Sequence, residues 1–290
     1  DAYARMTARS LKKYLPGATV IVKNVPGAGH IIGANEVYLS KTDGLTFGMG
    51  NFKGLIFTQI AGLLEGIRFD LNKFSWLANV ASEPQVLIVG KNTLYRSIKD
   101  FKQATKPVRM GASGVGSSSY NYSLMAGHIL GVNFKLVPGF SGSEADMAML
   151  RGELDGQIGA YDNLRPMIES EGSRVLLYIS KKKMPQFPDA PLIEEFATPE
   201  KRSLINLMLA MAELGRPVAA PPNMPAVRLK TLRDALEKAY KDPEMQAYYQ
   251  KVRLPISYIS GEETRKLFVN ALKQPPEVVK MVKDLAQSEK

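Results

Sequence analysis

The feature that most constrains the fold of this chain is a repeated alternation of short β-branched or apolar runs with helical patterns. Runs of this kind predict buried strands, and apolar residues three and four apart predict helices between them. Strands that alternate with helices favour an α/β fold with parallel pairing and helices on both faces. The expected strands are Thr19–Asn24, Thr46–Gly50, Phe74–Ala81, Gln85–Val89, Val108–Ala112, Phe134–Val137, Gln157–Ala160 and Arg174–Ser180, and the helices among them are His30–Leu39, Ser97–Ala104, Ser118–Leu130, Ser143–Arg151 and Leu164–Glu169.

The last third of the chain is helical, with polar caps or prolines where helices begin. Before these helices lies an extended, proline-rich segment, Arg216–Pro225. Together with Lys91–Tyr95 it predicts two crossings between lobes. We therefore expect lobe I to comprise residues 1–90 and 217–290, lobe II to comprise residues 91–216, and the two crossing strands to form a hinge that allows closure around a ligand.

Composition excludes several classes of protein. A chain of 290 residues suits two lobes, and the absence of Cys excludes thiolate nucleophiles, Cys-based zinc sites, iron–sulfur clusters and disulfides. No apolar stretch is long enough for a membrane span. The net charge of +10 favours anionic ligands. Because basic and acidic residues are mixed and no recognised module is visible, we expect no nucleic-acid partner.

The chain opens on a helical pattern that starts at Asp1, whose carboxylate is placed to cap the helix. In a parallel α/β sheet this helix would follow a strand. We therefore expect that the first strand, its loop and a signal peptide have been removed from the chain.

No catalytic centre is visible. His30 and His128 are the two histidines, and neither has the spacing of a metal site. There is no nucleophile elbow. The glycines from Gly27 to Gly33 follow a strand but have the wrong spacing for a dinucleotide fingerprint. We expect no catalytic residue, no metal and no cofactor.

The strongest candidate for a binding site is the turn Gly111–Ser119, in which glycines and serines lie between a strand and a helix. The unpaired N–H groups at the start of the helix and the Ser hydroxyls suit a carboxylate or a phosphate. The alternative is that one Ser caps the helix and the others are solvated.

Several short motifs follow one another along the chain: Asp1-Ala-Tyr-Ala-Arg5, Asn24-Val-Pro-Gly-Ala-Gly29 with Gly33, Asp43-Gly-Leu-Thr46, Ser113-Gly-Val-Gly-Ser-Ser118, Arg216-Pro-Val-Ala-Ala-Pro-Pro222, Lys241-Asp-Pro-Glu244, Ser260-Gly-Glu-Glu263 and Pro275-Pro-Glu-Val-Val279. In this order they resemble one family, the extracytoplasmic solute-binding proteins of tripartite tricarboxylate transporters, also called Bug or TctC-like proteins. Where many members have His after the serine loop, this chain has Tyr120, and Gly139-Phe-Ser-Gly-Ser143 replaces a YRG-like segment.

The resemblance implies a two-lobed periplasmic binding protein of type II-like α/β fold, each lobe a mixed, mainly parallel sheet flanked by helices. It implies a monomer, exported to the periplasm, that holds a small organic carboxylate in the cleft between lobes and presents it to membrane transporter subunits. Asp162 would accept a hydrogen bond from a donor group at the far end of the ligand. The expected ligand-binding residues are Asp1, Ala28, Gly29, Asn51, Ser113, Gly116, Ser117, Ser118, Ser119, Gly139 and Asp162.

Two other functions remain open at this stage, an α/β enzyme acting on an anionic substrate and the effector-sensing domain of a regulator. The chemistry of the ligand is also open. Aromatic acids, dicarboxylates, tricarboxylates and amino acids all present a carboxylate to the serine turn.

Overall fold

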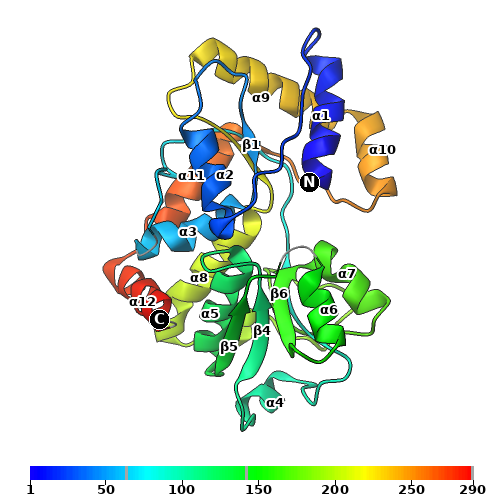
Figure 1. The fold of residues 1–290 in the computed structure, drawn as a ribbon, viewed down its shortest axis with the longest axis vertical. Helices are drawn as coiled ribbons and strands as arrows, with labels where there is room; N and C mark the ends of the chain where they lie inside the picture. The colour runs from blue at the N-terminus through cyan, green and yellow to red at the C-terminus, as the bar shows by residue number, and fades with distance from the viewer. Residues whose placement is uncertain (63–64, 141–142, 289–290) are drawn as a thin grey trace. The chain divides into compact units, whose positions relative to one another are not determined.

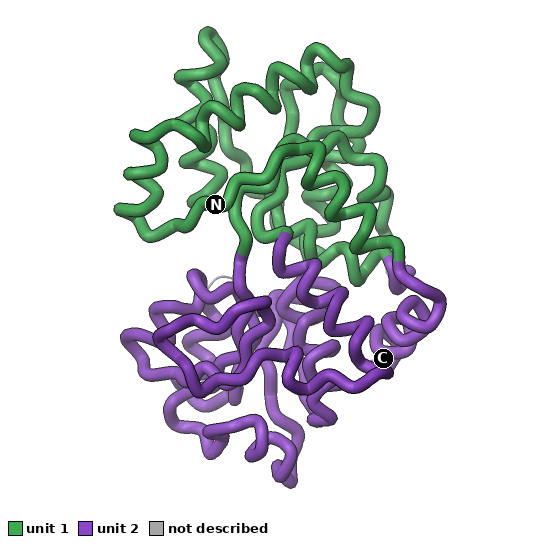
Figure 2. Tube along the Cα trace, turned by 180° about the vertical axis from the view of Figure 1, so that it is seen from behind, with its two compact units in different colours: residues 1–59, 64–82, 214–273 green, residues 60–63, 83–213, 274–290 purple. Residues whose placement is uncertain are grey.

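The computed structural model describes residues 1–62, 65–140 and 143–288. The chain divides into two compact units, which Figure 2 shows in different colours. Unit 1 comprises residues 1–59, 64–82 and 214–273, and unit 2 comprises residues 60–63, 83–213 and 274–290. Each unit has its own sheet and its own helices.

Unit 1 is built on a four-stranded sheet with the order β1-β8-β2-β9, in which each pair of neighbours is antiparallel. The segment Ala28–His30 forms a 3-10 turn before the second helix (Figure 1). The strands are β1 (Gly48–Met49), β2 (Ser75–Asn79), β8 (Pro217–Ala220) and β9 (Ile259–Ser260), and the helices are α1 (Ala2–Tyr14), α2 (Ile31–Tyr38), most of α3 (Phe52–Ala61), α9 (Ala226–Lys241), α10 (Pro243–Lys251) and α11 (Gly261–Leu272).

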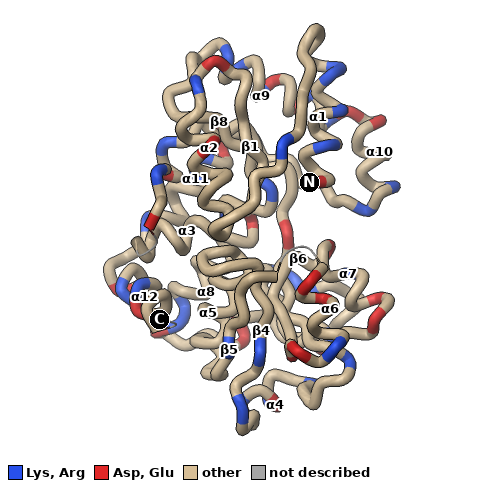
Figure 3. The backbone as a smooth tube through the Cα atoms, viewed as in Figure 1, with Lys and Arg blue, Asp and Glu red and all other residues tan. Residues whose placement is uncertain are grey.

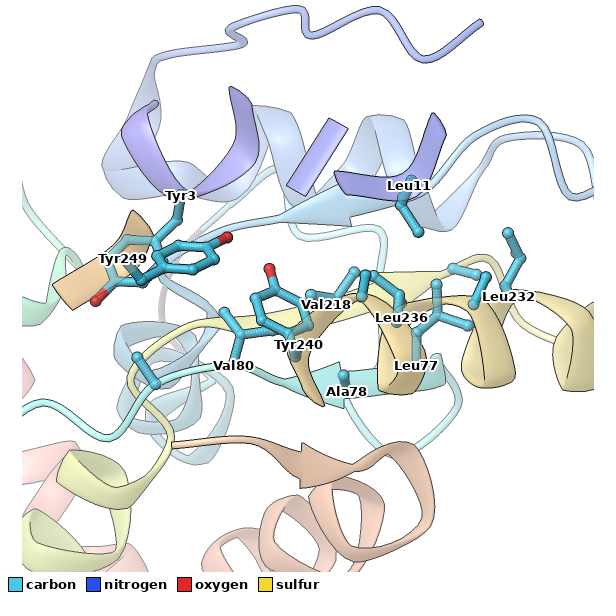
Figure 4. Close-up of a cluster of buried hydrophobic side chains, with 14 of the residues drawn as sticks. Tyr3, Leu11, Leu77, Ala78, Val80, Val218, Leu232, Leu236, Tyr240 and Tyr249 are labelled. Carbon is cyan, nitrogen blue, oxygen red and sulfur yellow. The ribbon is translucent and has the colours of Figure 1, made fainter. Parts of the chain in front are cut away.

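One face of the unit 1 sheet packs against α9, and α1 packs against α9, through a cluster of apolar and tyrosine side chains (Figure 4). Tyr3 of α1 stacks on Tyr249 of α10 with ring centroids 6.2 Å apart. Tyr240 of α9 lies 5.9 Å from the same ring and shares a hydrogen bond with Thr7. Tyr3 donates a hydrogen bond of 2.7 Å to the Pro255 carbonyl oxygen, so Tyr3 and Tyr240 combine a large apolar contact with a fixed orientation and hold α1 on α9 and α10.

Trp76 of β2 belongs to a second aromatic group. Its ring stacks on Phe268 of α11 with centroids 3.8 Å apart and an angle of 6° between the planes, and neither side chain is exposed. The helix can approach this closely because it begins with Gly261, where a Cβ atom would lie 2.3 Å from the Trp76 carbonyl oxygen. The glycine therefore sets the distance between α11 and β2.

Unit 2 is built on a five-stranded sheet with the order β5-β4-β6-β3-β7. The pairs β4–β5 and β4–β6 are parallel, and the pairs β3–β6 and β3–β7 are antiparallel. The strands are β3 (Gln85–Val89), β4 (Val108–Ala112), β5 (Phe134–Pro138), β6 (Gly156–Ala160) and β7 (Arg174–Ile179), and the helices are α4 (Ile98–Lys102), α5 (Ser118–Leu130), α6 (Glu144–Leu150), α7 (Tyr161–Glu169), α8 (Pro199–Glu213) and α12 (Pro276–Gln287), with a 3-10 turn η2 (Ile193–Phe196).

Helix α5 lies at the centre of unit 2 and packs against β4, β5 and β6 (Figure 1). Almost all of its side chains are buried, which matches a sequence that is apolar or small on every face. The helix ends at Gly131, whose φ of +65° is the left-handed conformation common after a helix. With both ends fixed, α5 is a rigid support for the turn that precedes it.

Three features of the structure correct the sequence predictions. Residues 19–24 form no strand, because Ile21 is 85% exposed and the segment has no partner in either sheet. The sheets are not mainly parallel, since the described pairs of unit 1 are antiparallel and those of unit 2 are evenly divided. Because residues 19–24 form no strand, β1 cannot pair in parallel with a strand before α2, and it pairs antiparallel with β8 instead.

The division of the chain also differs from the predicted boundaries at residues 90 and 216. The strand β3 pairs with β6 and β7, so residues 83–90 belong to unit 2, together with the predicted crossing Lys91–Tyr95. Residues 274–290 are also part of unit 2, where α12 contacts α5. The prediction that the crossings form a hinge stays a prediction.

Candidate functional site

The serine turn, residues 113–119, connects β4 to α5 in unit 2. Gly116 has a φ of +80°, a conformation that costs a residue with a Cβ atom about 1–2 kcal/mol. Its carbonyl oxygen accepts a hydrogen bond of 3.0 Å from the Asn121 side chain, and Ser117 is the N-cap of α5. The hydrogen bond from Asn121 and the cap at Ser117 therefore fix the turn to the helix that follows it.

The hydroxyl groups of the serine turn converge on Ser119. Its oxygen accepts a hydrogen bond of 3.1 Å from the Ser113 backbone N–H, and it lies 3.2 Å from the Ser117 hydroxyl and 3.4 Å from the Ser113 hydroxyl. Ser117 also accepts a bond of 3.4 Å from the Tyr120 backbone N–H. Ser118 is 7% exposed and lies in the same first turn of α5. Hydroxyl groups gathered at the positive end of a helix suit a negatively charged ligand.

Gly139 lies beside the serine turn. It follows β5, and the register places Pro138 opposite Ala112, the last residue of β4. Phe140 donates a backbone hydrogen bond of 3.1 Å to the Ala112 carbonyl oxygen. Gly139 has a φ of +110°, and of the segment that follows, Ser141 and Gly142 lie outside the described residues. The loops after β4 and β5 therefore meet.

Asp162 lies at the same edge of the sheet. It stands in the first turn of α7, directly after β6, and β6 runs parallel to β4 with Gly156 opposite Met110. The carboxyl ends of parallel strands are the usual position of ligands in open α/β sheets. The Asp162 carboxylate is 17% exposed and 3.8 Å from the Arg165 guanidinium. Its side chain is thus oriented by a cation of its own helix.

In unit 1, the predicted residues Ala28 and Gly29 lie in a turn of unusual backbone conformation. Ala28, Gly29 and His30 have φ values of +45°, +58° and +80°, after Gly27 at +121°. The His30 backbone N–H donates a bond of 3.0 Å to the Gly27 carbonyl oxygen. Non-glycine residues in this region are strained, and such strain gathers at functional sites.

Asn51 and Asp1 occupy other parts of unit 1. Asn51 follows β1, and its carbonyl oxygen accepts a bond of 3.2 Å from the Gly54 backbone N–H at the start of α3. Asp1 precedes α1, but its carboxylate makes no capping bond and instead accepts a bond of 2.9 Å from Arg5. The expectation that Asp1 caps the helix with its side chain is wrong, because the nearby guanidinium competes for the carboxylate.

The sequence did not single out Arg216 as a site residue. Its guanidinium lies over the Tyr3 ring, 5.5 Å from the centroid. Loss of hydration and, second, this positive charge lower the pKa of the His30 imidazole. The charge of Arg216 therefore acts on the 27–30 turn. The signal in the sequence was a lone Arg at the start of the proline-rich segment.

Basic and acidic residues are interspersed along both units (Figure 3). Among the described residues, no three or more His, Cys, Asp or Glu side chains are grouped so that they could hold a metal ion. A search of the same residues for a helix with the length and apolarity of a membrane span finds none.

Comparison with known proteins identifies the family of the chain. The family model of the tripartite tricarboxylate transporter family receptor, TctC, matches residues 3–283. A relative, a UPF0065 protein of Bordetella pertussis, is 24% identical over 247 residues, which are 84% of this chain and 73% of the relative.

Two solved structures share the fold. The periplasmic binding protein BugD superposes with a TM-score of 0.77 at 21% identity, over 97% of this chain and 91% of BugD. MatC from Rhodopseudomonas palustris, solved with bound malate, superposes with a TM-score of 0.75 at 20% identity, over 99% of this chain and 94% of MatC. These likenesses confirm the predicted α/β fold of a periplasmic binding protein. Since the family model spans nearly the whole sequence, this chain belongs to the tripartite tricarboxylate transporter receptor family.

Proposed function

We propose that this protein captures a small organic carboxylate in the periplasm and delivers it to the membrane subunits of a tripartite tricarboxylate transporter. The observation that carries the proposal is the convergence of the Ser113, Ser117 and Ser119 hydroxyls where α5 begins. Family membership supports the role of receptor. The malate bound to MatC, which has the same fold, supports a carboxylate as the ligand.

Different residues bind different parts of the ligand. The backbone N–H groups near Gly116 and the hydroxyls of Ser117, Ser118 and Ser119 hold the carboxylate. Each charge-assisted hydrogen bond contributes about 1.5–3 kcal/mol, so three or four of them support micromolar affinity after the cost of association. Asp162 accepts a hydrogen bond from a hydroxyl, amide or amino group elsewhere on the ligand. Unit 1 contributes the turn at Ala28 and Gly29, together with Asn51. Gly139 lines the site beside the serine turn.

A thermal-shift screen of aromatic acids, dicarboxylates, tricarboxylates and amino acids tests the proposal. A ligand at one hundred times its Kd stabilises the folded protein by about 2.7 kcal/mol, which is a clear rise in Tm. Calorimetry on each hit then gives the stoichiometry, for which the proposal expects one ligand per chain. If no carboxylate raises the Tm, the proposal is wrong.

The same samples distinguish a receptor from an enzyme. A receptor binds its ligand and releases it unchanged, so proton NMR spectra of an acid incubated with the protein show no product. A new product would favour the α/β enzyme instead. A signal peptide in the full-length gene product, with the protein recovered in the periplasmic fraction, would exclude the regulator and support export.

The predictions that the protein is a monomer and that the ligand lies between the two units remain to be tested. Size-exclusion chromatography with light scattering measures the mass of the particle. Small-angle X-ray scattering with saturating ligand is expected to give a smaller radius of gyration than without ligand. Identical curves would contradict a moving hinge.

A further inference from the structure

Unit 2 contains a groove between α4 and β7, the strand at one end of the five-stranded sheet. The groove has a volume of about 490 Å³, which is in the range of ligand pockets. Its apolar lining includes Val175 and Leu176 of β7, Ile98 of α4 and Phe196 of η2. What such a groove binds depends on the charges and the backbone groups around it.

The α4 side of the groove is rigid. Phe101 is buried, and its ring meets the Phe134 ring of β5 edge to face with centroids 5.7 Å apart. At the start of the helix, the Asp100 carboxylate accepts backbone hydrogen bonds of 2.6 Å from Arg96 and 2.9 Å from Ser97. These contacts fix α4 to unit 2 and do not involve the side chains of its lysines.

The charges that line the groove favour an anionic partner. Arg96, Lys99 and Lys102 are exposed cations on the α4 side, and in the described parts of the chain no carboxylate forms an ion pair with any of them. The Lys102 ammonium lies 5.7 Å from the centroid of the Phe196 ring. Asp189 lines the groove as well, so three positive charges face one negative charge. A surface with this balance attracts acidic groups.

The backbone of β7 is open along the groove. One side of the strand pairs with β3. On the other side, the Tyr178 N–H donates a bond of 2.9 Å to the Pro191 carbonyl oxygen, and Tyr178 forms a parallel bridge with Leu192. Among the described residues, this extended segment makes no further bridge with β7, so Arg174–Leu177 have no strand on that side. An open edge of this kind accepts an added strand.

An irregularity in β7 favours a short occupant. Leu87 lies opposite Leu177 and Ile88 lies opposite Val175, so Leu176 is an extra residue in the ladder. A bulge bends the strand and increases its twist, and it is one of the devices that prevent long edges from pairing with each other. A short peptide segment follows a bent edge more easily than the edge strand of a second copy.

The groove lies away from the serine turn. Both β6 and β7 are antiparallel to β3, and β6 is parallel to β4, so β4 and β7 run in the same direction. Val175 is near the amino end of β7, whereas the serine turn follows the carboxyl end of β4. The two therefore lie at opposite ends of the sheet, and an occupant of the groove leaves the serine turn accessible.

We propose that this groove is a docking site for a short, extended, acidic segment of a partner protein. The backbone of the segment adds to β7 as a further strand, and its carboxylates lie against Lys99 and Lys102. Because alternate side chains of a strand point to the same face, acidic residues at every second position reach the same side of the groove. Backbone hydrogen bonds supply the affinity, and the cations supply the specificity.

An NMR titration of the isotope-labelled protein tests the proposal. The probes are hexapeptides with capped ends, in which Glu alternates with Val, Leu or Phe. We expect the best of them to shift the amide signals of Val175, Leu176 and α4, and to bind more weakly as the salt concentration rises. A hexapeptide in which Pro alternates with Glu lacks half of the backbone donors and is expected not to bind. A single Glu residue with capped ends, at equal carboxylate concentration, is also expected not to bind.

Charge variants test the role of the cations. The double variant Lys99→Glu with Lys102→Glu is expected to lower the affinity for the best peptide by about tenfold or more. Asp189→Asn is expected to raise the affinity, because it removes the negative charge of the groove. The control is Lys135→Glu with Lys283→Glu, which makes the same change of net charge at exposed residues of unit 2 that do not line the groove. Thermal unfolding shows whether each variant keeps the fold.

Several results would overturn the proposal. They are the absence of shifts with every peptide at millimolar concentration, shifts confined to the serine turn, equal binding of the single Glu residue, and equal losses in the two double variants. Light scattering that shows a dimer of the wild-type protein and a monomer of the Lys99→Glu, Lys102→Glu variant would assign the groove to a second copy instead. None of these results concerns the capture of a carboxylate, which the thermal-shift screen tests separately.

Discussion

The Ser119 hydroxyl oxygen accepts a hydrogen bond of 3.1 Å from the Ser113 backbone N–H and so joins the two ends of the serine turn. Ser117 lies 3.2 Å from the same oxygen. A hydroxyl with neighbours on both sides is held ready for a ligand, because its rotation is already restricted. Ser119 is therefore the residue of the turn whose loss changes the site most.

We expect Ser119→Ala to weaken carboxylate binding by about tenfold, the loss of one hydrogen bond to a charged group. Ser118→Ala is also expected to weaken binding without unfolding the protein. Ser123→Ala is the control, since its hydroxyl donates 2.8 Å to the Ser119 carbonyl oxygen within α5 and lies one turn away from the site. Calorimetry on the three variants measures the effect. Unchanged affinity in Ser119→Ala would remove this residue from the site.

Gly116→Ala and Gly131→Ala introduce similar backbone strain at opposite ends of α5. Both glycines have positive φ, +80° at the start of α5 and +65° at its end, so each substitution costs about 1–2 kcal/mol of folding free energy. Only Gly116→Ala is expected to weaken ligand binding, because only that change alters the serine turn. Denaturant unfolding measures the first effect and calorimetry the second. Equal affinities in the two variants would show that the turn does not bind the ligand.

Asp242 predicts a dependence of stability on pH. Its carboxylate caps α10 and accepts a hydrogen bond of 2.6 Å from Lys13, and this bond, followed by one from Tyr14, lowers the pKa of Asp242 well below its ordinary value of 3.8. A carboxyl whose pKa is lowered by folding stabilises the protein above pH 3.8, and this stabilisation is lost as the pH falls toward the lowered pKa.

We therefore expect Asp242→Asn to have a lower Tm than the wild-type protein at neutral pH, with a difference that shrinks as the pH falls below 3.8. Asp284→Asn is the control, because its ion pair with Lys280 lies on the exposed surface of α12. Thermal unfolding from pH 2 to pH 7 gives the comparison. A difference that stays constant over this range would show that the charge of Asp242 is not what stabilises the fold.

The Trp76–Phe268 stack predicts the largest effect on stability. Phe268→Ala is expected to lower the free energy of unfolding by about 3–5 kcal/mol, because it leaves a cavity beside a fully buried ring. Leu94→Ala, at a side chain that is 90% exposed, is the control and is expected to change stability by less than about 0.5 kcal/mol. Similar unfolding curves for the two variants would contradict the role of the stack.

The sequence predicted local structure best where its signals were local. The strand Gln85–Val89 has the bounds expected from the flanking Pro84 and Gly90. Ser97 and Asp100 form the capping box that the sequence suggested, although Asp is the less common partner. Helix Ser118–Leu130 also has its expected bounds. Such features depend on residues within a few positions of each other, so one sequence contains the information.

Pairing between strands was harder to predict. Gly48 pairs with Ala219, a contact between residues far apart in the chain, and the alternation of strands and helices alone wrongly favoured parallel neighbours. The segment Thr19–Asn24 was wrongly predicted as a strand for the same reason. Its β-branched residues fit a strand, but a strand needs a partner, and a single sequence does not reveal whether one is near.

The candidate site was predictable in unit 2 and less so in unit 1. Ser113, Gly139 and Asp162 each follow a predicted strand, and the parallel pairing of these strands brings their carboxyl ends together at one edge of the sheet. Arg216 approaches Tyr3 only through the tertiary fold. No spacing in the sequence connects these two residues, and Arg216 was therefore assigned to a linker.

The most direct test of the account is a crystal structure of the protein with the best acid from the thermal-shift screen. We expect a carboxylate oxygen within about 2.7–3.2 Å of a backbone N–H group at the start of α5, and the Ser119 hydroxyl in contact with the same carboxylate. An acid bound elsewhere on the protein, with the serine turn bonded only to its own residues, would contradict the account.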